Sequence, residues 1–269
     1  EQRPNILFIF LDDFGWRDTG YMGSDFYETP NIDRLAKGGM VFTDAYSCSA
    51  NCAPARACLL SGQYTPRHEI FNVGTTPRGS AKHRRLEHIA GTKTLRPDII
   101  TWAESLQQAG YRTGMFGKWH LGTTPGEQGF DVEVDHTKLP GFRGHFGPNG
   151  QYLADVLTDK TIEFIEGSKT KPWCAYLAHY AVHTPIQAKS PLIAKYKEKA
   201  RRMGLPEAAK ANFKQDGTLV RGTKPGLSGN KARQEQNHPA YAAMVETMDT
   251  KSPPMAWTSA HLPAAKFIS

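Results

Sequence analysis

The most informative stretch of this sequence places a cysteine, a potential nucleophile, at the start of a predicted helix. In residues 52–62, CAPARACLLSG, Pro54 suits a first helical turn and Gly62 suits a helix end. Cys52 is expected just ahead of this helix, where free N–H groups and the helix dipole favour negative charge. Arg56 follows one turn later and can aim a permanently charged fork at the same anion. The spacing predicts a nucleophile beside an anion site, and a buried structural thiol or half of a disulfide is the alternative.

Two adjacent acids close the first apolar run. The run 4–13, PNILFIFLDD, is typical of a central strand of a parallel sheet covered on both faces, and it ends in Asp12 and Asp13. Ligands of open α/β sheets bind at the carboxyl ends of such strands. Adjacent carboxylates repel each other unless a cation lies between them, and their hard oxygens favour Ca²⁺ or Mg²⁺. A solvated turn at the end of the strand is the plainer alternative.

Lys118 and His120 follow another predicted strand. Residues 110–122 read GYRTGMFGKWHLG, and alternation along 111–116 predicts a short strand that Gly117 ends. If the extended geometry continues, Lys118 and His120 point the same way. A lysine and a histidine alone on a loop would be surface residues.

The run 173–185, WCAYLAHYAVHTP, carries two histidines at the end of a further apolar strand. We expect His179 to be a satisfied core histidine. His183 precedes a turn that contains proline, where it either bonds the backbone or lies near a leaving group.

Together these segments resemble the sulfatase family, the formylglycine-dependent, arylsulfatase-like group within the alkaline phosphatase superfamily. Residues 52–62 are similar to its signature C-x-P-x-R, with Ser61 as a mild departure. Residues 110–120 are similar to its G-Y-x-T-x-x-x-G-K-W-H signature, in which Phe116 is bulkier than usual, and His183 matches its His-x-Pro. The resemblance covers residues 3–249 and implies the alkaline-phosphatase-like fold.

The resemblance assigns a nucleophile and a metal. It implies that Cys52 is oxidised after synthesis to formylglycine, whose hydrated aldehyde attacks the sulfur of a sulfate ester. It also implies that Asp12, Asp13 and position 52 bind Ca²⁺ or Mg²⁺, while Arg56 helps to hold the nucleophile.

The remaining implied roles concern charge and protons. Lys118 would contact the sulfate, His120 would handle the formylglycine hydroxyl, and His183 would donate a proton to the departing alcohol. The implied reaction releases inorganic sulfate from a sulfated small molecule, glycan or aryl sulfate. A formylglycine-generating, sulfatase-maturing enzyme is the implied protein partner.

Strands and helices alternate along the chain, which predicts an α/β fold with a central, mostly parallel sheet flanked by helices. Thr29 and Pro30 predict the N-cap and first turn of one helix, and Gly38 its end. We expect helices at 31–37, 98–109, 151–165 and 239–249, a strand at 40–46, and an irregular segment at 67–97. These elements predict one catalytic domain over residues 1–249.

Residues 200–239 are rich in Lys, Arg, Gly and Gln. Charged runs are usually solvated, so we expect a surface insertion there, with a basic substrate-binding loop as the alternative.

The resemblance stops after Asp249. The family's next strand ends in Asp-Asn or a close variant that completes the metal site, and residues 250–269 contain neither this pair nor the lysine that follows it. The sequence therefore predicts a catalytic domain truncated at its C-terminal side, followed by a tail outside the family pattern. Because Ca²⁺ takes about 6 to 8 oxygen ligands, fewer ligands predict weaker metal binding.

The composition restricts the classes of partner that this protein is expected to bind. The net charge of +7 and the pI near 9.2 favour anions, but the basic residues are dispersed and no nucleic-acid module is recognisable. No stretch approaches the roughly 20 apolar residues that span a bilayer. The first residue is Glu1, which predicts a processed and exported protein: periplasmic, secreted or lysosomal. The four cysteines make neither a disulfide scaffold nor a zinc site.

Three functions fit these observations. The leading one is a sulfuric ester hydrolase, in which truncation leaves open whether this chain turns over. The second is a phosphonate or phosphate ester hydrolase of the same superfamily. The third is a non-catalytic anion-binding remnant that keeps Arg56, Lys118 and His120.

Overall fold

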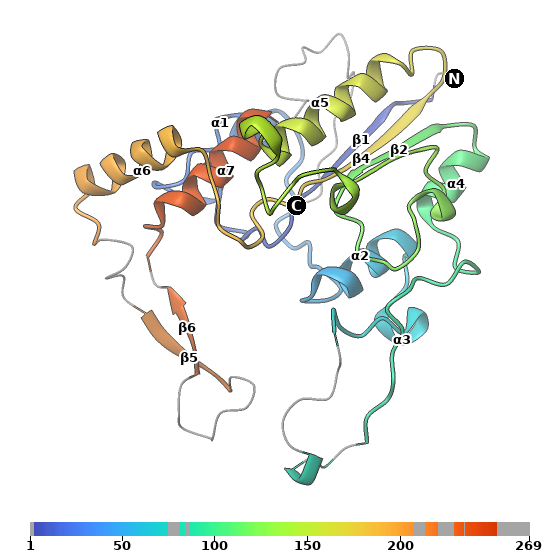
Figure 1. Cartoon of the computed structure of the whole chain (residues 1–269), viewed down its shortest axis with the longest axis horizontal. Coiled ribbons are helices and arrows are strands. Elements are labelled where there is room, and N and C mark those ends of the chain that lie inside the picture. The colour runs from blue at the N-terminus through green and yellow to red at the C-terminus, as the bar shows by residue number, and fades with distance from the viewer. Residues whose placement is uncertain are drawn as a thin grey trace.

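Four parallel strands form the central sheet of the computed structural model (Figure 1). The structure describes residues 3–74, 81–83, 85, 87–206, 213–219, 229–233 and 235–251. Within these ranges every neighbouring pair in the sheet is parallel. The strand order across the sheet is β1 (Ile6–Phe10), β4 (Trp173–Ala178), β2 (Arg112–Gly117) and β3 (Val132–Asp135). The strands expected at the acid pair, before Lys118 and before His179 are confirmed.

The position of β1 corrects one expectation. We predicted a central strand covered on both faces. Both faces are covered, since Phe8 and Phe10 pack on one core and Leu7 and Ile9 on the opposite one. In the described structure, however, β1 pairs only with β4 and lies at the edge of the sheet. The two inner positions of the described sheet belong to β4 and β2, and all six residues of β4 are buried. An apolar run alone does not distinguish the two places, because both strands are rich in large apolar side chains.

Helices cover both faces of the sheet, which confirms the layered α/β architecture (Figure 1). On one face α2 (Cys52–Ser61) and α4 (Trp102–Gln108) pack in a core with Met115 and Tyr176. On the other face α5 (Leu153–Glu166) packs with Phe116 and Leu177. Adjacent residues of one strand thus serve opposite cores, as the pleat requires.

A third core joins α6 (Ser190–Arg202) and α7 (Pro239–Lys251) to Phe26 and Tyr27. The remaining helices of the described residues are short, apart from α1 (Pro30–Gly38): they are α3 (Thr65–His68) and the 3₁₀ helices η1 (Gly20–Met22), η2 (Ala81–His83), η3 (Gly126–Gln128), η4 (His136–Lys138) and η5 (Pro148–Gly150). No helix in the described part of the chain is both long and apolar enough to cross a membrane.

The start of α1 is capped from a distant part of the chain. Thr29 precedes the helix as expected, but its hydroxyl makes no cap; it accepts from the Gly20 N–H and donates to Asp33. The carboxylate of Asp249, on α7, instead accepts from the N–H groups of Asn31 (3.2 Å) and Ile32 (2.8 Å). A negative group at a helix N-terminus is favoured by both the free N–H groups and the dipole.

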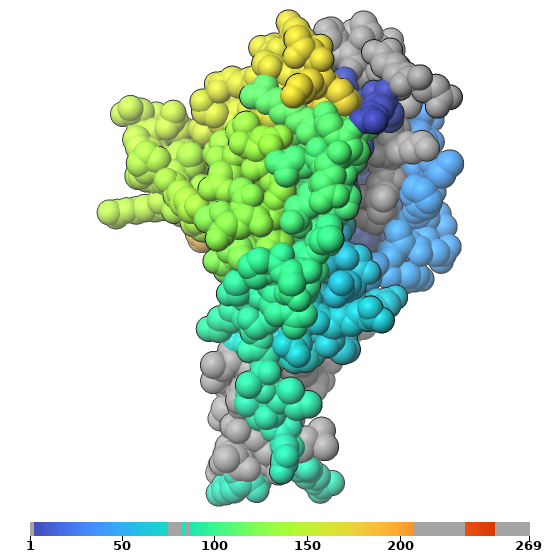
Figure 2. Space-filling model, turned by 90° about the vertical axis from the view of Figure 1, so that its right-hand side faces the viewer, coloured from blue at the N-terminus to red at the C-terminus, as the bar shows by residue number. Residues whose placement is uncertain are grey.

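Other expectations hold in part. Residues 40–46 form no strand and are exposed, because no described strand lies beside them to pair with. The described residues of the segment 67–97 are irregular apart from α3 and η2. In Figure 2 residues 81–83 and 87–91 (teal) extend away from the α/β body.

The expected surface insertion at 200–239 contains the antiparallel strands β5 (Phe213–Leu219) and β6 (Gly229–Arg233). Its residues 207–212, 220–228 and 234, and the predicted tail from 252 to 269, lie outside the described residues.

Candidate active site

Cys52 is the first residue of α2, so the helix begins one residue earlier than the sequence suggested. Asn51 takes the N-cap position. Pro54 lies in the first turn, and Gly62 ends the helix with a left-handed φ of 65° while its N–H donates to the Cys58 carbonyl. Burial, with the Asp12 and Asp13 carboxylates, raises the pKa of the Cys52 thiol. An unmodified Cys52 is therefore a protonated thiol at neutral pH and a weak nucleophile.

The two acids behind β1 differ in environment. Asp12 is buried at 4% exposure, whereas Asp13 is exposed and has a left-handed φ of 57°. One oxygen of Asp12 lies 2.5 Å from Lys118 Nζ and the other lies 3.4 Å from Arg56 Nη2. Burial alone would raise the pKa of Asp12, but these two cations outweigh it and lower the pKa below its ordinary value. Asp12 is thus a carboxylate between two fixed positive charges.

Arg56 is a buried guanidinium with unused donors. Its exposure is 1%, its Cζ lies 5.0 Å from the centre of the Phe10 ring, and its Nη1 donates to the Lys118 carbonyl at 2.6 Å. Neither Nε nor Nη2 makes a hydrogen bond in the described structure. Buried donors without acceptors are costly, so this fork is suited to receive an anion.

Lys118 owes its position to the glycine before it. Gly117 ends β2 with a φ of 124°, and a Cβ there would lie 1.9 Å from the Ala178 carbonyl oxygen. The Lys118 N–H donates to that same carbonyl, which anchors its backbone to β4. The buried ammonium can therefore reach Asp12 from a fixed strand end.

His120 departs from the expected extended path. Its φ of 66° is left-handed and its side chain is exposed, so the alternation that would align it with Lys118 is broken. Partial desolvation, followed by the charges of Lys118 and Arg56, lowers the pKa of His120. The imidazole is thus neutral at neutral pH and able to accept a proton.

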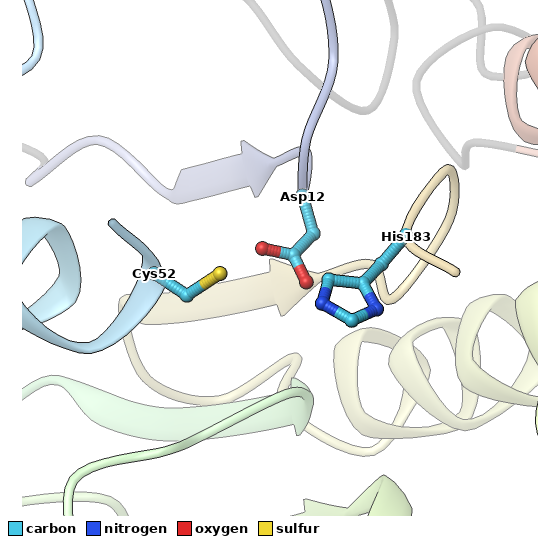
Figure 3. A group of neighbouring side chains, drawn as sticks. All are labelled: Asp12, Cys52 and His183. Carbon is cyan, nitrogen blue, oxygen red and sulfur yellow. The ribbon is translucent and has the colours of Figure 1, made fainter. Parts of the chain in front are cut away.

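His183 closes the site from the turn after β4. Its Nδ1 donates to the Thr184 carbonyl at 2.7 Å, which leaves Nε2 facing Asp13 Oδ2 at 3.6 Å. One possible ligand atom from each of Asp12, Cys52 and His183 lies within 4.8 Å of the other two. Figure 3 shows the Asp12 carboxylate between the Cys52 sulfur and the His183 ring. The structure thus gathers residues that lie between 40 and 171 positions apart in sequence.

His179 is a core histidine as expected, but it is not satisfied. It is completely buried and neither ring nitrogen has a hydrogen-bond partner in the described structure. Burial lowers the pKa of His179 to about 4. Its backbone N–H donates to the Phe10 carbonyl at 2.9 Å.

The donor set suits a hard divalent cation once position 52 offers oxygen. Asp12 and Asp13 supply carboxylate oxygens, whereas the sulfur of Cys52 is a ligand that Ca²⁺ and Mg²⁺ do not favour. A formylglycine hydrate would place oxygen in the region of Sγ, which lies 3.9 Å from Asp13 Oδ1. A metal ion there would share the Asp12 carboxylate with Lys118 and Arg56.

Sequence reasoning missed a group of rings behind His183. Tyr180 stacks on His183, and His136 and His145 stack on Tyr180 in turn. Tyr180 lies three residues before His183, so the sequence could have predicted that the two side chains lie close together. The positions of His136 and His145 could not be predicted, because they depend on how loops distant in sequence pack.

Comparison with known proteins agrees with this arrangement. The sulfatase family model matches residues 4–251. The chain is 35% identical over 193 residues to an N-acetylglucosamine-6-O-sulfatase of Bacteroides thetaiotaomicron, with 68% of this chain and 31% of that protein covered. It is 29% identical over 229 residues to an N-acetylgalactosamine-6-sulfatase of Homo sapiens, with 71% and 42% covered. The chain spans between 25% and 48% of the length of eight similar curated relatives.

Solved structures show the same fold. The crystal structure of Ps i-CgsB superposes with a TM-score of 0.63 at 27% identity, covering 93% of this chain and 53% of that one. A protein solved in complex with its substrate, D-glucosamine-2-N,6-O-disulfate, superposes with a TM-score of 0.59 at 28% identity, covering 80% and 41%. Because the family model spans the elements that build this site, from β1 to α7, the chain belongs to the sulfatase family.

Proposed function

We propose that this site hydrolyses sulfate esters of sugars or aryl alcohols and releases inorganic sulfate. The observation that carries the proposal is the convergence of Cys52, Asp12 and His183 within 4.8 Å, beside the buried cations Arg56 and Lys118. The named relatives act on 6-sulfated amino sugars, which supports a sulfated carbohydrate as the substrate class.

The proposal includes a modified residue and a metal. Position 52 would carry formylglycine, whose hydrate supplies the attacking hydroxyl, and Asp12, Asp13 and position 52 would hold Ca²⁺ or Mg²⁺, which supplies positive charge to the transferring group. A sulfatase-maturing enzyme would convert Cys52. A location outside the cytoplasm and a domain boundary near 249 remain predictions of the sequence.

Four residues would supply the charge and the proton transfers that the reaction needs. Arg56 and Lys118 present fixed positive charge where a sulfate would bind, and this charge acts more strongly away from water. His183, whose Nε2 is turned away from the Thr184 carbonyl, would carry the proton for the departing alcohol. His120, with its lowered pKa, would remove a proton from the second hydroxyl at position 52, so that the bond from carbon to the sulfate-bearing oxygen breaks, inorganic sulfate leaves and the aldehyde is restored.

A paired assay tests the reaction class. The protein, co-expressed with a maturing enzyme, is given a sulfate ester and a phosphate ester of the same alcohol. We expect the sulfate ester to be turned over faster, and we expect Cys52→Ala to abolish its turnover. The buried Cys58→Ala is the matched control, because Cys58 lies on the same helix but outside the grouped residues.

Three results would contradict the proposal. Faster turnover of the phosphate ester would assign the site to phosphoryl transfer, and sulfate release by Cys52→Ala would exclude position 52 as the nucleophile. The third result is a protein that binds inorganic sulfate but hydrolyses neither ester, although mass analysis shows that Cys52 has been converted to formylglycine. Such a protein would be an anion-binding protein and not an enzyme.

A further inference from the structure

We propose that Tyr180 is a positioning residue that holds the imidazole of His183 for proton transfer to the leaving group. The inference rests on the proposed function and names a part of the same site to which no role has yet been given. Tyr180 is half-buried and follows β4, three residues before His183.

The ring of Tyr180 and its hydroxyl both act on His183. The two rings stack with centroids 4.8 Å apart. The hydroxyl donates to the Thr184 carbonyl at 2.7 Å, and this carbonyl also accepts from His183 Nδ1 at 2.7 Å. Tyr180 therefore fixes one face of the imidazole and the acceptor that orients it, which keeps Nε2 directed toward Asp13.

Tyr180 is itself fixed by two further histidines. His136 and His145 stack on its ring with centroids 4.7 Å and 4.9 Å away. His145 Nε2 lies 2.8 Å from the His183 carbonyl oxygen and must carry a proton to bond it, so this histidine also holds the backbone of the turn. The ring of Tyr180 is thus a fixed support rather than a mobile surface side chain.

Lys118 gives Tyr180 a second contact within the site. Its Nζ lies 5.4 Å from the centre of the Tyr180 ring, a cation–π distance, but its 2.5 Å contact with Asp12 remains when the ring is removed. Loss of Tyr180 should therefore affect His183 more than Lys118. This difference separates a role in proton donation from a general loss of site structure.

The kinetic test uses leaving groups of different basicity. A sugar 6-sulfate needs a proton on its departing alcohol, whereas 4-nitrophenyl sulfate releases a stable phenolate. We expect Tyr180→Leu to lower kcat for the sugar sulfate by about 100-fold and for 4-nitrophenyl sulfate by less than about 5-fold, with KM little changed. Tyr180→Phe, which keeps the stacked ring, should restore most of the rate. Tyr64→Leu, at a tyrosine that is 69% exposed, should leave kcat unchanged for both substrates.

An equal loss with both substrates would overturn the proposal, as would a Phe variant no better than Leu. If Tyr180→Leu does not fold, Tyr180→Met keeps much of the side-chain volume without an aromatic ring and replaces it in both measurements.

A spectroscopic test does not depend on turnover. The Cε1–H signal of His183, assigned by its loss in His183→Asn, should lie upfield in the native protein and in Tyr180→Phe because of the stacked ring. It should move downfield in Tyr180→Leu. An unchanged signal would overturn the proposal. A shifted signal in a protein that hydrolyses neither sulfate ester would instead uphold the contact and contradict the proposed function.

Discussion

His179 shows what a single buried side chain costs when it has no partner. Both ring nitrogens lie in the core without a hydrogen bond, and burial lowers the pKa to about 4. An unfolded chain binds a proton at this histidine near its ordinary value of 6.5. Between these two values the unfolded state holds the extra proton, so folding stability falls as the pH drops from about 6.5 to about 4.

We therefore expect His179→Leu to reduce the acid sensitivity of the protein. The two pKa values correspond to a free-energy change on the order of 3 kcal/mol over this pH range. Urea unfolding between pH about 7 and about 4 should show a shallower fall of the free energy of unfolding in the variant. The exposed His83→Gln is the control and should keep the native slope. Parallel curves for native protein and His179→Leu would contradict the assignment.

Among the elements, α4 carries a complete reciprocal cap. The Thr101 side chain accepts from the Glu104 N–H at 3.2 Å, and the Glu104 carboxylate accepts from the Thr101 N–H at 2.7 Å. The same Thr101 hydroxyl donates to the Gln128 carbonyl at 2.8 Å. One side chain therefore joins α4 to the loop before β3 and keeps the helix packed on the core beside β2.

We expect Thr101→Ala to destabilise the protein by about 2 kcal/mol. It removes the N-cap and leaves a buried carbonyl without its donor, two losses of about 1 kcal/mol each. Thr101→Ser, which keeps the hydroxyl, should recover most of the difference, and the exposed Thr43→Ala should be neutral. Chemical denaturation measures all three; a loss below about 0.5 kcal/mol for Thr101→Ala would show that water replaces the cap.

For the whole molecule, the net charge of +7 acts on any anionic substrate before contact. Long-range attraction speeds encounter and weakens as salt shortens the Debye length from about 30 Å at 0.01 M to about 10 Å at 0.1 M. The attraction grows with the charge of the substrate.

Turnover of a multiply sulfated oligosaccharide should therefore depend more on salt than turnover of a monosulfate. Between about 10 mM and about 200 mM NaCl we expect kcat/KM to fall roughly 10-fold for the oligosaccharide and roughly 2-fold for the monosulfate. Unchanged kcat would assign the effect to encounter. An equal dependence for both substrates would mean that only charges within the site matter.

The sequence predicted which side chains would lie close together better than it predicted the groups that pack around them. Asp12, Lys118 and His183 each follow a strand, and parallel strands bring their carboxyl ends to one edge, so their convergence followed from the motifs. The left-handed backbone of His120 and the rings around Tyr180 could not be read in this way, because both depend on packing between loops distant in sequence. The strand expected at 40–46 failed since local alternation does not supply a neighbouring strand.

The distant cap of α1 bears on the order in which the protein takes shape on the ribosome. The Asp249 carboxylate is synthesised 218 residues after the Asn31 N–H that it binds. At typical rates of translation, the nascent α1 waits about 10 to 40 seconds for this partner. One of the first helices to leave the ribosome is therefore completed by one of the last described residues to be made, and its final packing must follow the emergence of nearly all the chain between them.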